Sequence, residues 1–410
     1  MNLRTRQSAV NQAKVEQHGA SSEAPFDLLT NAVWTVRTTG LLLTVLTVIA
    51  PISSIGAPRY QPHALVVAPP KKPALPQTPS AVDVYNRSLM AEARYSYRGH
   101  QITTYWRTGR AIRVLITHLA PNWRRIEYLA PDRLRGNVLI SDGHQEWRYD
   151  ASSNWLHRHT VAADKPSPQD MPVKYSQLRA NYDLAFLPKS QDFADRKTFV
   201  LTITRKSNHV LARKMWIDAA TGLVLKREAY SETGKMNVTV AFSDIDYHAK
   251  LTRATFAPPG SQANQSGIKK VKDVKEPDHV EQTVPVKAAA GMLGGEAFAP
   301  RGVDEFRLTS AAIVSRPGKK PVLHLRYTDG LVLVSVFEQT RTQTKRPTRV
   351  PSTMKPVAIG KTTGHLAHHA SVVTVNWDTP TLNMTMIGEV SDARMLDLAA
   401  DFGNPAKIHR

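Results

Sequence analysis

Two groups of residues in this chain could take part in catalysis or metal binding: the aspartate–glycine pairs and the clustered histidines. Asp142-Gly143 and Asp329-Gly330 could serve as acidic catalytic positions. Each pair, however, separates runs of alternating apolar residues, and Asp-Gly is a strong signal for a tight β-hairpin because type I′ turns need positive φ. Both pairs are therefore predicted to be turns, and no spacing in the sequence brings two carboxylates to a catalytic distance.

The histidines could bind a metal ion. His365, His368 and His369 lie close together before a predicted strand, and His157 and His159 alternate along another. A structural zinc site needs four ligands, and no further ligand stands near either group, so a polar loop at 365–369 is the simpler interpretation. The chain also lacks a nucleophile elbow, a phosphate-binding glycine loop and an HExxH helix. We expect no catalytic residue, no metal and no cofactor.

Composition limits the class of protein. The chain has 410 residues, 41% of them hydrophobic, which is enough for two to three domains. It has no cysteine, which excludes disulfides, thiol nucleophiles and cysteine–zinc sites. The net charge of +20 suits nucleic acid, an anionic membrane or an acidic protein, and it is also compatible with a merely solvated basic surface. No nucleic-acid-binding motif is present, so we do not expect nucleic acid.

An apolar segment near the amino terminus predicts the location of the protein. Arg37 precedes the apolar run from Gly40 to Ala50, which Pro51 ends. This run is shorter than the roughly 20 residues of a bilayer-spanning helix and fits the core of a secretory signal. Residues 1–57 are therefore predicted to be an extension with a signal peptide, or an anchor if uncleaved, and residues 58–79 a proline-rich tether. Both alternatives place the remainder in the periplasm.

Residues 80–260 are predicted to form the first domain. Ser80 is a good N-cap for a helix, and a second helix is expected around residues 176–184. Apolar residues then alternate with polar ones, as in Val238, Val240 and Phe242, which is the pattern of half-buried strands. The short connections favour antiparallel neighbours. The predicted fold class is α+β, mainly antiparallel β: an unclosed half-barrel with covering helices, followed by a small β-sheet and helix domain.

A curved sheet beneath helices can enclose a ligand cavity. Apolar and aromatic residues on the strands of the first domain are the candidates for lining it. They could equally fill an ordinary core, because antiparallel sheets favour aromatic side chains in any case. The predicted cavity residues are Ile112, Val114, Ile116, Tyr128, Trp147, Phe199, Leu201 and Trp216.

Residues 261–297 lose all periodicity and are predicted to be a linker, and residues 298–410 a second domain. Its strands are expected at 306–314, 322–327, 331–337, 372–377 and 382–387, with a basic insertion at 341–354. The run 331–337 is apolar on both faces, so it is predicted to be a central strand. Ser391 should cap a closing helix.

Several of these segments resemble the family of the sigma-E factor regulatory protein RseB, also called MucB. The resemblance spans most of the chain after Ser80, and the order and spacing of its pieces carry it. The segment at 194–196 departs from the family by lacking a glycine before Arg196. The matching pieces are residues 95–99, 125–131, 140–143, 181–182, 215–218, 221–226, 327–331, 334–337 and 387–390.

The resemblance implies a periplasmic protein with a first domain similar to LolA and LolB and a smaller second domain. It further implies binding of the extracytoplasmic part of an anti-sigma factor, modulation of envelope-stress signalling, and lipid or lipopolysaccharide as a releasing ligand. Two alternatives stay open. A LolA-like lipid or lipoprotein carrier would need only the first domain, and a structural envelope protein would bind no ligand. The sequence does not define the oligomeric state.

Overall fold

The computed structural model describes residues 79–160, 170–187, 191–260, 272–275, 280–293, 297–315, 318–341, 354–402 and 408–409. The predicted signal segment at 39–57 lies outside these ranges, as do the predicted tether up to residue 78 and most of the predicted basic insertion at 341–354. Within the described ranges, no helix combines the length and the hydropathy that crossing a membrane requires.

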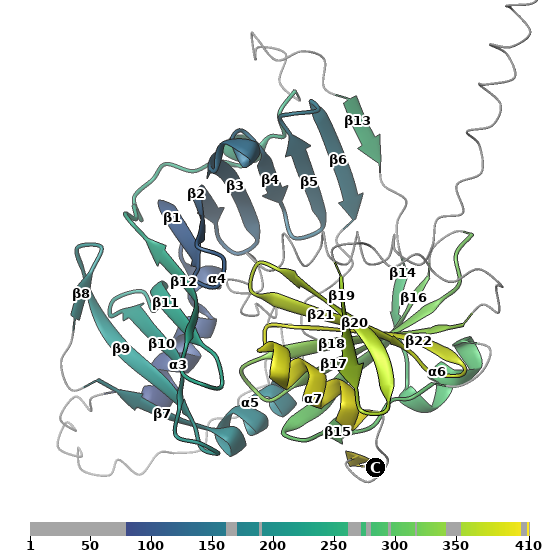
Figure 1. Ribbon diagram of the computed structural model, residues 1–410. Helices are drawn as coiled ribbons and strands as arrows, with labels where there is room; N and C mark the ends of the chain where they lie inside the picture. Colours follow the sequence, from purple (N-terminus) through teal and green to yellow (C-terminus); the bar gives the residue numbers. More distant parts are fainter. Residues whose placement is uncertain are drawn as a thin grey trace, which may run out of the picture.

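A sheet of thirteen strands, here called the larger sheet, takes up most of the first half of the chain (Figure 1). The strand order is β13-β6-β5-β4-β3-β2-β1-β12-β11-β10-β9-β7, and β8 pairs with β9. Neighbouring strands are antiparallel except β13 and β6, and the two end strands do not pair with each other in the described structure, so the sheet is unclosed. The predicted fold class is confirmed. The strands are β1 (Tyr97–Tyr105), β2 (Arg110–Leu119), β3 (Trp123–Ala130), β4 (Val138–Ser141), β5 (Gln145–Asp150), β6 (Trp155–Thr160), β7 (Tyr182–Phe186), β8 (Gln191–Phe193), β9 (Arg196–Arg205), β10 (Leu211–Asp218), β11 (Val224–Tyr230), β12 (Met236–Phe242) and β13 (Lys272–Lys275).

The two faces of the larger sheet differ in what covers them. Helices α3 (Ala81–Leu89), α4 (Ala91–Arg94) and α5 (Asp170–Asn181) lie against one face, here called the inner face. The short 3-10 helix η2 (Arg253–Phe256) packs on the other, the outer face, and η1 (Asp132–Leu134) follows β3. Because side chains alternate across each strand, the register assigns every strand residue to one of these faces.

Helix α3 begins where the sequence predicts. The Ser80 hydroxyl accepts a hydrogen bond from the Asp83 backbone N–H at 3.1 Å, and the Asp83 carboxylate accepts one from the Ser80 N–H at 3.2 Å. This capping box satisfies backbone N–H groups that have no partner within the helix. The second helix differs from the prediction, because α5 ends at Asn181. From Tyr182 onward the chain pairs with β9 as strand β7.

A second sheet of ten strands, the smaller sheet, follows in sequence. Its order is β19-β20-β21-β22-β18-β17-β16-β15-β23, with β14 paired to β16, so β18 is central as predicted. Helices α6 (Val286–Leu293) and α7 (Asp392–Phe402) contribute to its core. The strands are β14 (Val280–Thr283), β15 (Gly302–Val303), β16 (Phe306–Ser315), β17 (Val322–Thr328), β18 (Leu333–Thr340), β19 (Lys355–Ile359), β20 (Thr362–His369), β21 (Val372–Asp378), β22 (Leu382–Gly388) and β23 (Ile408–His409).

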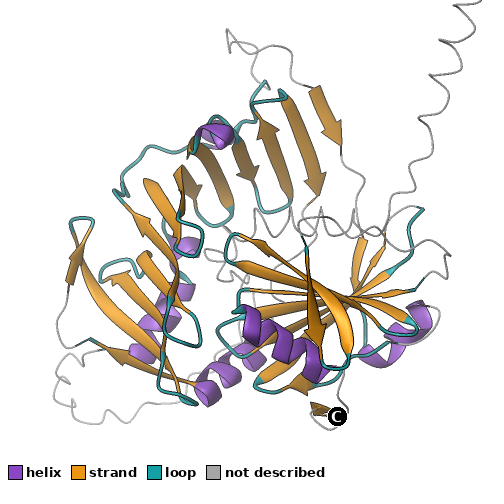
Figure 2. Ribbon diagram, in the orientation of Figure 1, coloured by secondary structure: helices purple, strands orange, loops and turns teal. Residues whose placement is uncertain are grey.

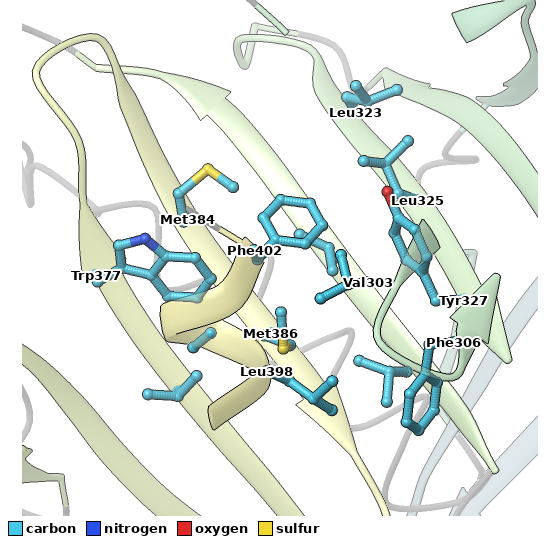
Figure 3. Packing of buried hydrophobic residues seen from close by; sticks show 14 of the residues in the cluster. Val303, Phe306, Leu323, Leu325, Tyr327, Trp377, Met384, Met386, Leu398 and Phe402 are labelled. Atoms are coloured by element: carbon cyan, nitrogen blue, oxygen red, sulfur yellow. The ribbon is translucent and has the colours of Figure 1, made fainter. Parts of the chain in front are cut away.

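The core of the smaller sheet is apolar and aromatic (Figure 3). The ring of Phe402, at the end of α7, packs edge-on against that of Tyr327 on β17, with their centroids 5.7 Å apart. Met384 and Met386 of β22 contribute to the same cluster. Helix α7 thus packs by one apolar side, which carries Met395, Leu398 and Phe402. The predicted closing helix after Ser391 is present.

The structure changes two further expectations (Figure 2). The predicted linker at 261–297 contains β13, β14 and α6, so it is not free of regular structure. His365, His368 and His369 lie on strand β20 rather than in a loop. The positions of the domain boundaries stay a prediction, whereas the predicted glycine turns are confirmed: Gly143 and Gly330 have φ of 89° and 101°.

Candidate functional site

Six of the eight predicted cavity residues lie on the inner face of the larger sheet. Val114 and Ile116 are buried in one cluster, against which Ile112 and Tyr128 pack half-buried. The register explains this, because Val114 pairs with Tyr128 across β2 and β3, so both side chains point to the same face. These four residues form the inner patch, whose half-buried members are Ile112 and Tyr128.

Leu201 and Phe199 lie in the neighbouring cluster on the same face. There Leu201 is fully buried and Phe199 is half-buried, together with Val84 and Tyr85 of α3 and Leu178 of α5. The helices therefore fill the space over β9 and β10 with their own side chains. This part of the predicted cavity is packed as a core.

Trp147 and Trp216 lie on the outer face and do not share a space with the other six residues. Trp147 of β5 pairs with Ile140, whose cluster includes Phe256 of η2. Trp216 pairs with Val200 and Lys226, and the Lys226 ammonium lies 4.2 Å from the centroid of its ring. Each tryptophan directly follows an inner-face position or precedes one on its own strand. Because side chains alternate between the two faces, both tryptophans point to the outer face.

The two sheets meet at a polar, buried contact, here called the seam. The hairpin turn between β17 and β18 carries Asp329, which is only 4% exposed. Its carboxylate accepts a hydrogen bond from the Tyr182 hydroxyl at 2.6 Å, and its backbone carbonyl accepts one from the Asn181 side-chain amide at 2.9 Å. Burial raises the pKa of the Asp329 carboxyl above its usual value. Such a group is tolerated only where donors surround it.

Gly330 brings this turn into backbone contact with α5. Its φ is 101°, and a Cβ built there would lie 2.0 Å from the Leu178 backbone nitrogen. Any other residue would be strained by the positive φ and would also collide with a helix backbone. The predicted turn at Asp329-Gly330 is therefore also the point at which the smaller sheet docks on α5 and β7.

A second seam contact joins β10 to the end of β22. The Arg213 guanidinium and the Glu389 carboxylate approach to 3.5 Å. Arg227 lies beside them on the inner face, where burial and the charge of Arg213 lower its pKa to about 9. A small hollow, partly open to solvent and with room for about one water molecule, lies here between the sheets. Its lining includes Arg205, Arg213, Glu232, Leu331, Val332 and Glu389.

A third seam contact comes from the turn after β1. The Arg107 guanidinium donates to the Ala370 carbonyl at 2.8 Å and lies 3.6 Å from the Asp392 carboxylate. His368 lies 2.6 Å from the same carboxylate. His368, predicted as an exposed loop residue, thus contacts the first turn of α7 beside the seam. In the described structure His365 and His369 are on the same strand but are not joined with it into a metal-binding group.

Of these seam residues, the sequence analysis considered only Asp329 as a functional candidate, as a possible catalytic acid, and assigned it to a turn. The seam residues come from segments that are far apart in the sequence, and none of them stands out by residue type in its own segment. They are Tyr182, Arg213, Asp329 and Glu389. The arrangement holds two sheets in one relative position and presents apolar and charged groups at their junction.

Comparison with known proteins identifies the first of the two regions. The family model of the MucB/RseB N-terminal domain matches residues 88–260. Residues 88–260 therefore form a domain of the MucB/RseB family. The matched segment includes the inner patch and strands β1 to β12 of the larger sheet. No curated protein sequence matches the chain.

Solved structures give more distant similarities. The MucA/MucB complex of Pseudomonas aeruginosa contains a chain 19% identical to this one, covering 78% of this chain and 97% of its own, with a TM-score of 0.49. MucB in complex with MucA(peri) is 20% identical, with the same coverage and TM-score. A LolA superfamily protein from Nitrosomonas europaea is 13% identical over 44% of this chain and 99% of its own, with a TM-score of 0.23.

Proposed function

We propose that this chain is a periplasmic regulatory protein that binds the extracytoplasmic part of a membrane anti-sigma factor and so modulates envelope-stress signalling. The observation that carries the proposal is the MucB/RseB family match over residues 88–260. MucB, one of the two proteins for which that family is named, has been solved in complex with MucA(peri). On this proposal the chain acts by binding and release rather than by catalysis.

The inner patch and the seam are the proposed contact surfaces. Ile112 and Tyr128 are half-buried on the inner face, where a partner's apolar side chains can complete their burial. The net charge of +20 favours a partner segment with acidic residues, mainly by speeding association and orienting it. Export, which the predicted signal segment at 39–57 would provide, places these surfaces in the same compartment as the partner.

The test is a binding measurement with the purified extracytoplasmic part of a membrane anti-sigma factor, with MucA(peri), which is bound by MucB in a solved structure, as the first probe. Ile112→Asp places a charge on the inner patch, and Ile102→Asp is its matched control. Ile102 lies on the neighbouring strand, on the outer face, and is 37% exposed. We expect Ile112→Asp to weaken binding by roughly 2 kcal/mol or more, as a central interface residue does, and Ile102→Asp to change it little. Equal effects of both substitutions would refute the assignment of the site.

A lipid ligand is the competing proposal. It corresponds to the LolA-like alternative, in which the inner face carries acyl chains. Native mass spectrometry of the folded protein would then show added mass that organic extraction removes. The filled cluster of Leu201, Tyr85 and Leu178 favours the peptide, because an acyl chain would have to displace α3 or α5 from this part of the sheet.

A further inference from the structure

Three buried polar atoms that have no hydrogen-bond partner in the protein gather at the hollow in the seam. They are Nη1 of Arg213, Oε2 of Glu232 and Oε1 of Glu389, and all three residues line the hollow. Arg213 lies on β10 and Glu232 in the turn after β11, whereas Glu389 follows β22 of the smaller sheet. Buried polar groups are nearly always hydrogen-bonded, so the three atoms together indicate a bound molecule between the sheets.

The direct contact across the hollow does not satisfy these atoms. Nη2 of Arg213 and Oε2 of Glu389 lie 3.5 Å apart, whereas a charge-assisted N–H···O bond is normally about 2.7–2.9 Å long. The Arg213 side chain is only 9% exposed. The second nitrogen and the second oxygen of this pair are both shielded from solvent, so bulk water does not supply the missing bonds.

The neighbouring side chains hold Glu232 at the hollow. The Arg205 guanidinium donates to the carbonyls of Tyr230 and Ser231, each at 3.1 Å. The Asn208 side-chain amide donates to the Glu232 carbonyl, also at 3.1 Å. These bonds fix the turn after β11 against the end of β9 and the turn that follows it. The Glu232 carboxylate is therefore brought to the hollow by a turn that is itself well bonded.

We propose that the hollow is a binding site for one water molecule, which joins the two sheets by accepting a hydrogen bond from Arg213 and donating to Glu232 and Glu389. A metal ion has no lone pair to accept the Arg213 N–H, and a halide ion has no proton to donate to the two carboxylates. Water does both. The hollow has room for about one such molecule, and about three hydrogen bonds are typical of a buried water.

The water makes Glu232 a positioning residue of the seam, because its carboxylate acts on the smaller sheet through the bridge. It also becomes part of the surface that a docked segment meets. Displacing a well-ordered water costs affinity unless the displacing group reproduces its hydrogen bonds. A segment docked across the mouth of the hollow should therefore leave the water in place. The bridge itself does not depend on the function proposed above.

The direct test is a high-resolution crystal structure of the full chain, with crystals grown in chloride and in bromide. We expect one density peak within about 2.7–3.2 Å of the three atoms, with no anomalous signal there in bromide. A bromide signal would identify an anion and overturn the proposal. An empty hollow, or one closed by a direct bond from Nη1 of Arg213 to Glu389, would overturn it as well.

The substitution Glu232→Ala tests the bridge in solution, because the sign of its effect differs with and without the water. Two carboxylates at one hollow repel each other if nothing between them donates, so removal of one would then strengthen the seam. With the bridge, the same substitution removes a hydrogen bond and weakens the seam. Hydrogen exchange of the Leu331 and Val332 amides, whose residues line the hollow, should then be about threefold to tenfold faster.

Lys235→Ala is the matched control, since Lys235 is an exposed residue of the same turn, and it should leave this exchange unchanged. Because both carboxylates act through one water, Glu232→Ala combined with Glu389→Ala should add little to the effect of Glu389→Ala alone. Slower or unchanged exchange in Glu232→Ala would contradict the bridge. Effects of the two substitutions that simply multiply in the double variant would contradict it too.

Discussion

We expect the free energy of unfolding to depend on pH through one buried carboxyl group, that of Glu338. This residue lies on the central strand β18 with its side chain toward the core of the smaller sheet, and it is 0% exposed. Its Oε2 accepts a hydrogen bond from the Phe298 backbone N–H at 2.8 Å, and its Oε1 has no hydrogen-bond partner in the described structure. Burial raises the pKa of this carboxyl to about 8.

The sign and size of the effect follow from the two pKa values. In the unfolded chain the carboxyl ionises near 4.5, whereas in the folded protein it stays protonated up to about pH 8. Between these values the folded state holds a proton that the unfolded state has lost. Stability is then full below pH 4.5 and falls as pH rises, by about 1.4 kcal/mol per unit. From pH 5 to pH 8 the loss amounts to about 3 kcal/mol.

The assay is urea denaturation of the wild type and of Glu338→Gln at pH 5, 6.5 and 8. The glutamine keeps an acceptor for the Phe298 N–H but cannot ionise, so its advantage over the wild type should grow with pH to about 3 kcal/mol. Asp397→Asn is the control, since Asp397 is an exposed carboxylate of α7 in the same part of the protein. If the wild type and Glu338→Gln lose stability in parallel between pH 5 and 8, the reasoning is wrong.

Three further substitutions test the seam and the first helix. Gly330→Ala should lower the free energy of unfolding by roughly 2 kcal/mol or more and should speed hydrogen exchange of the α5 amides. Gly318→Ala is the control, because Gly318 also has a positive φ but a Cβ there would have nothing within 4 Å. It should lower the free energy of unfolding by only about 1 kcal/mol. Tyr182→Phe removes a donor from the buried Asp329 carboxylate and should cost about 1–3 kcal/mol in thermal or urea unfolding. Ser80→Ala should cost about 1 kcal/mol and fray α3 first, as seen by hydrogen exchange.

Local patterns predicted the strands well and their faces less well. Val238, Val240 and Phe242 alternate with polar residues and all lie buried on the inner face of β12, because one face of that strand packs and the other is less buried. Trp147 and Trp216 look the same in sequence, yet they lie on the outer face. On β10 both faces are apolar, because Met215 and Ile217 lie on the inner face and Trp216 on the outer one. On β5 the apolar residues Trp147 and Tyr149 lie together on the outer face, and Arg148 lies on the inner one. Which side is inner then depends on register with neighbouring strands, which a single strand does not encode.

The seam could not be predicted from the sequence at all. Asp329-Gly330 carries the signal of a hairpin turn, and the structure confirms the turn, but the signal is identical for an exposed turn and a buried one. Burial here depends on Tyr182, which is 147 residues away. Strands β13 and β14 were missed for a different reason. Each has four residues, too few for an alternating pattern to show, and pairing with an existing edge rather than propensity makes them strands.

The polar character of the seam indicates how a ligand would be recognised. A seam of apolar residues alone would tolerate small rotations, whereas the Tyr182–Asp329 bond and the Gly330–Leu178 approach fix both direction and distance. Arg213 and Glu389 then stand opposite each other from different sheets at the hollow. Any segment that docks across the mouth of this hollow would contact groups of both sheets at once, so its affinity would depend on their relative placement. The binding site proposed here is therefore a property of the joined sheets, and Tyr182→Phe should weaken binding of such a segment even though Tyr182 does not line the hollow.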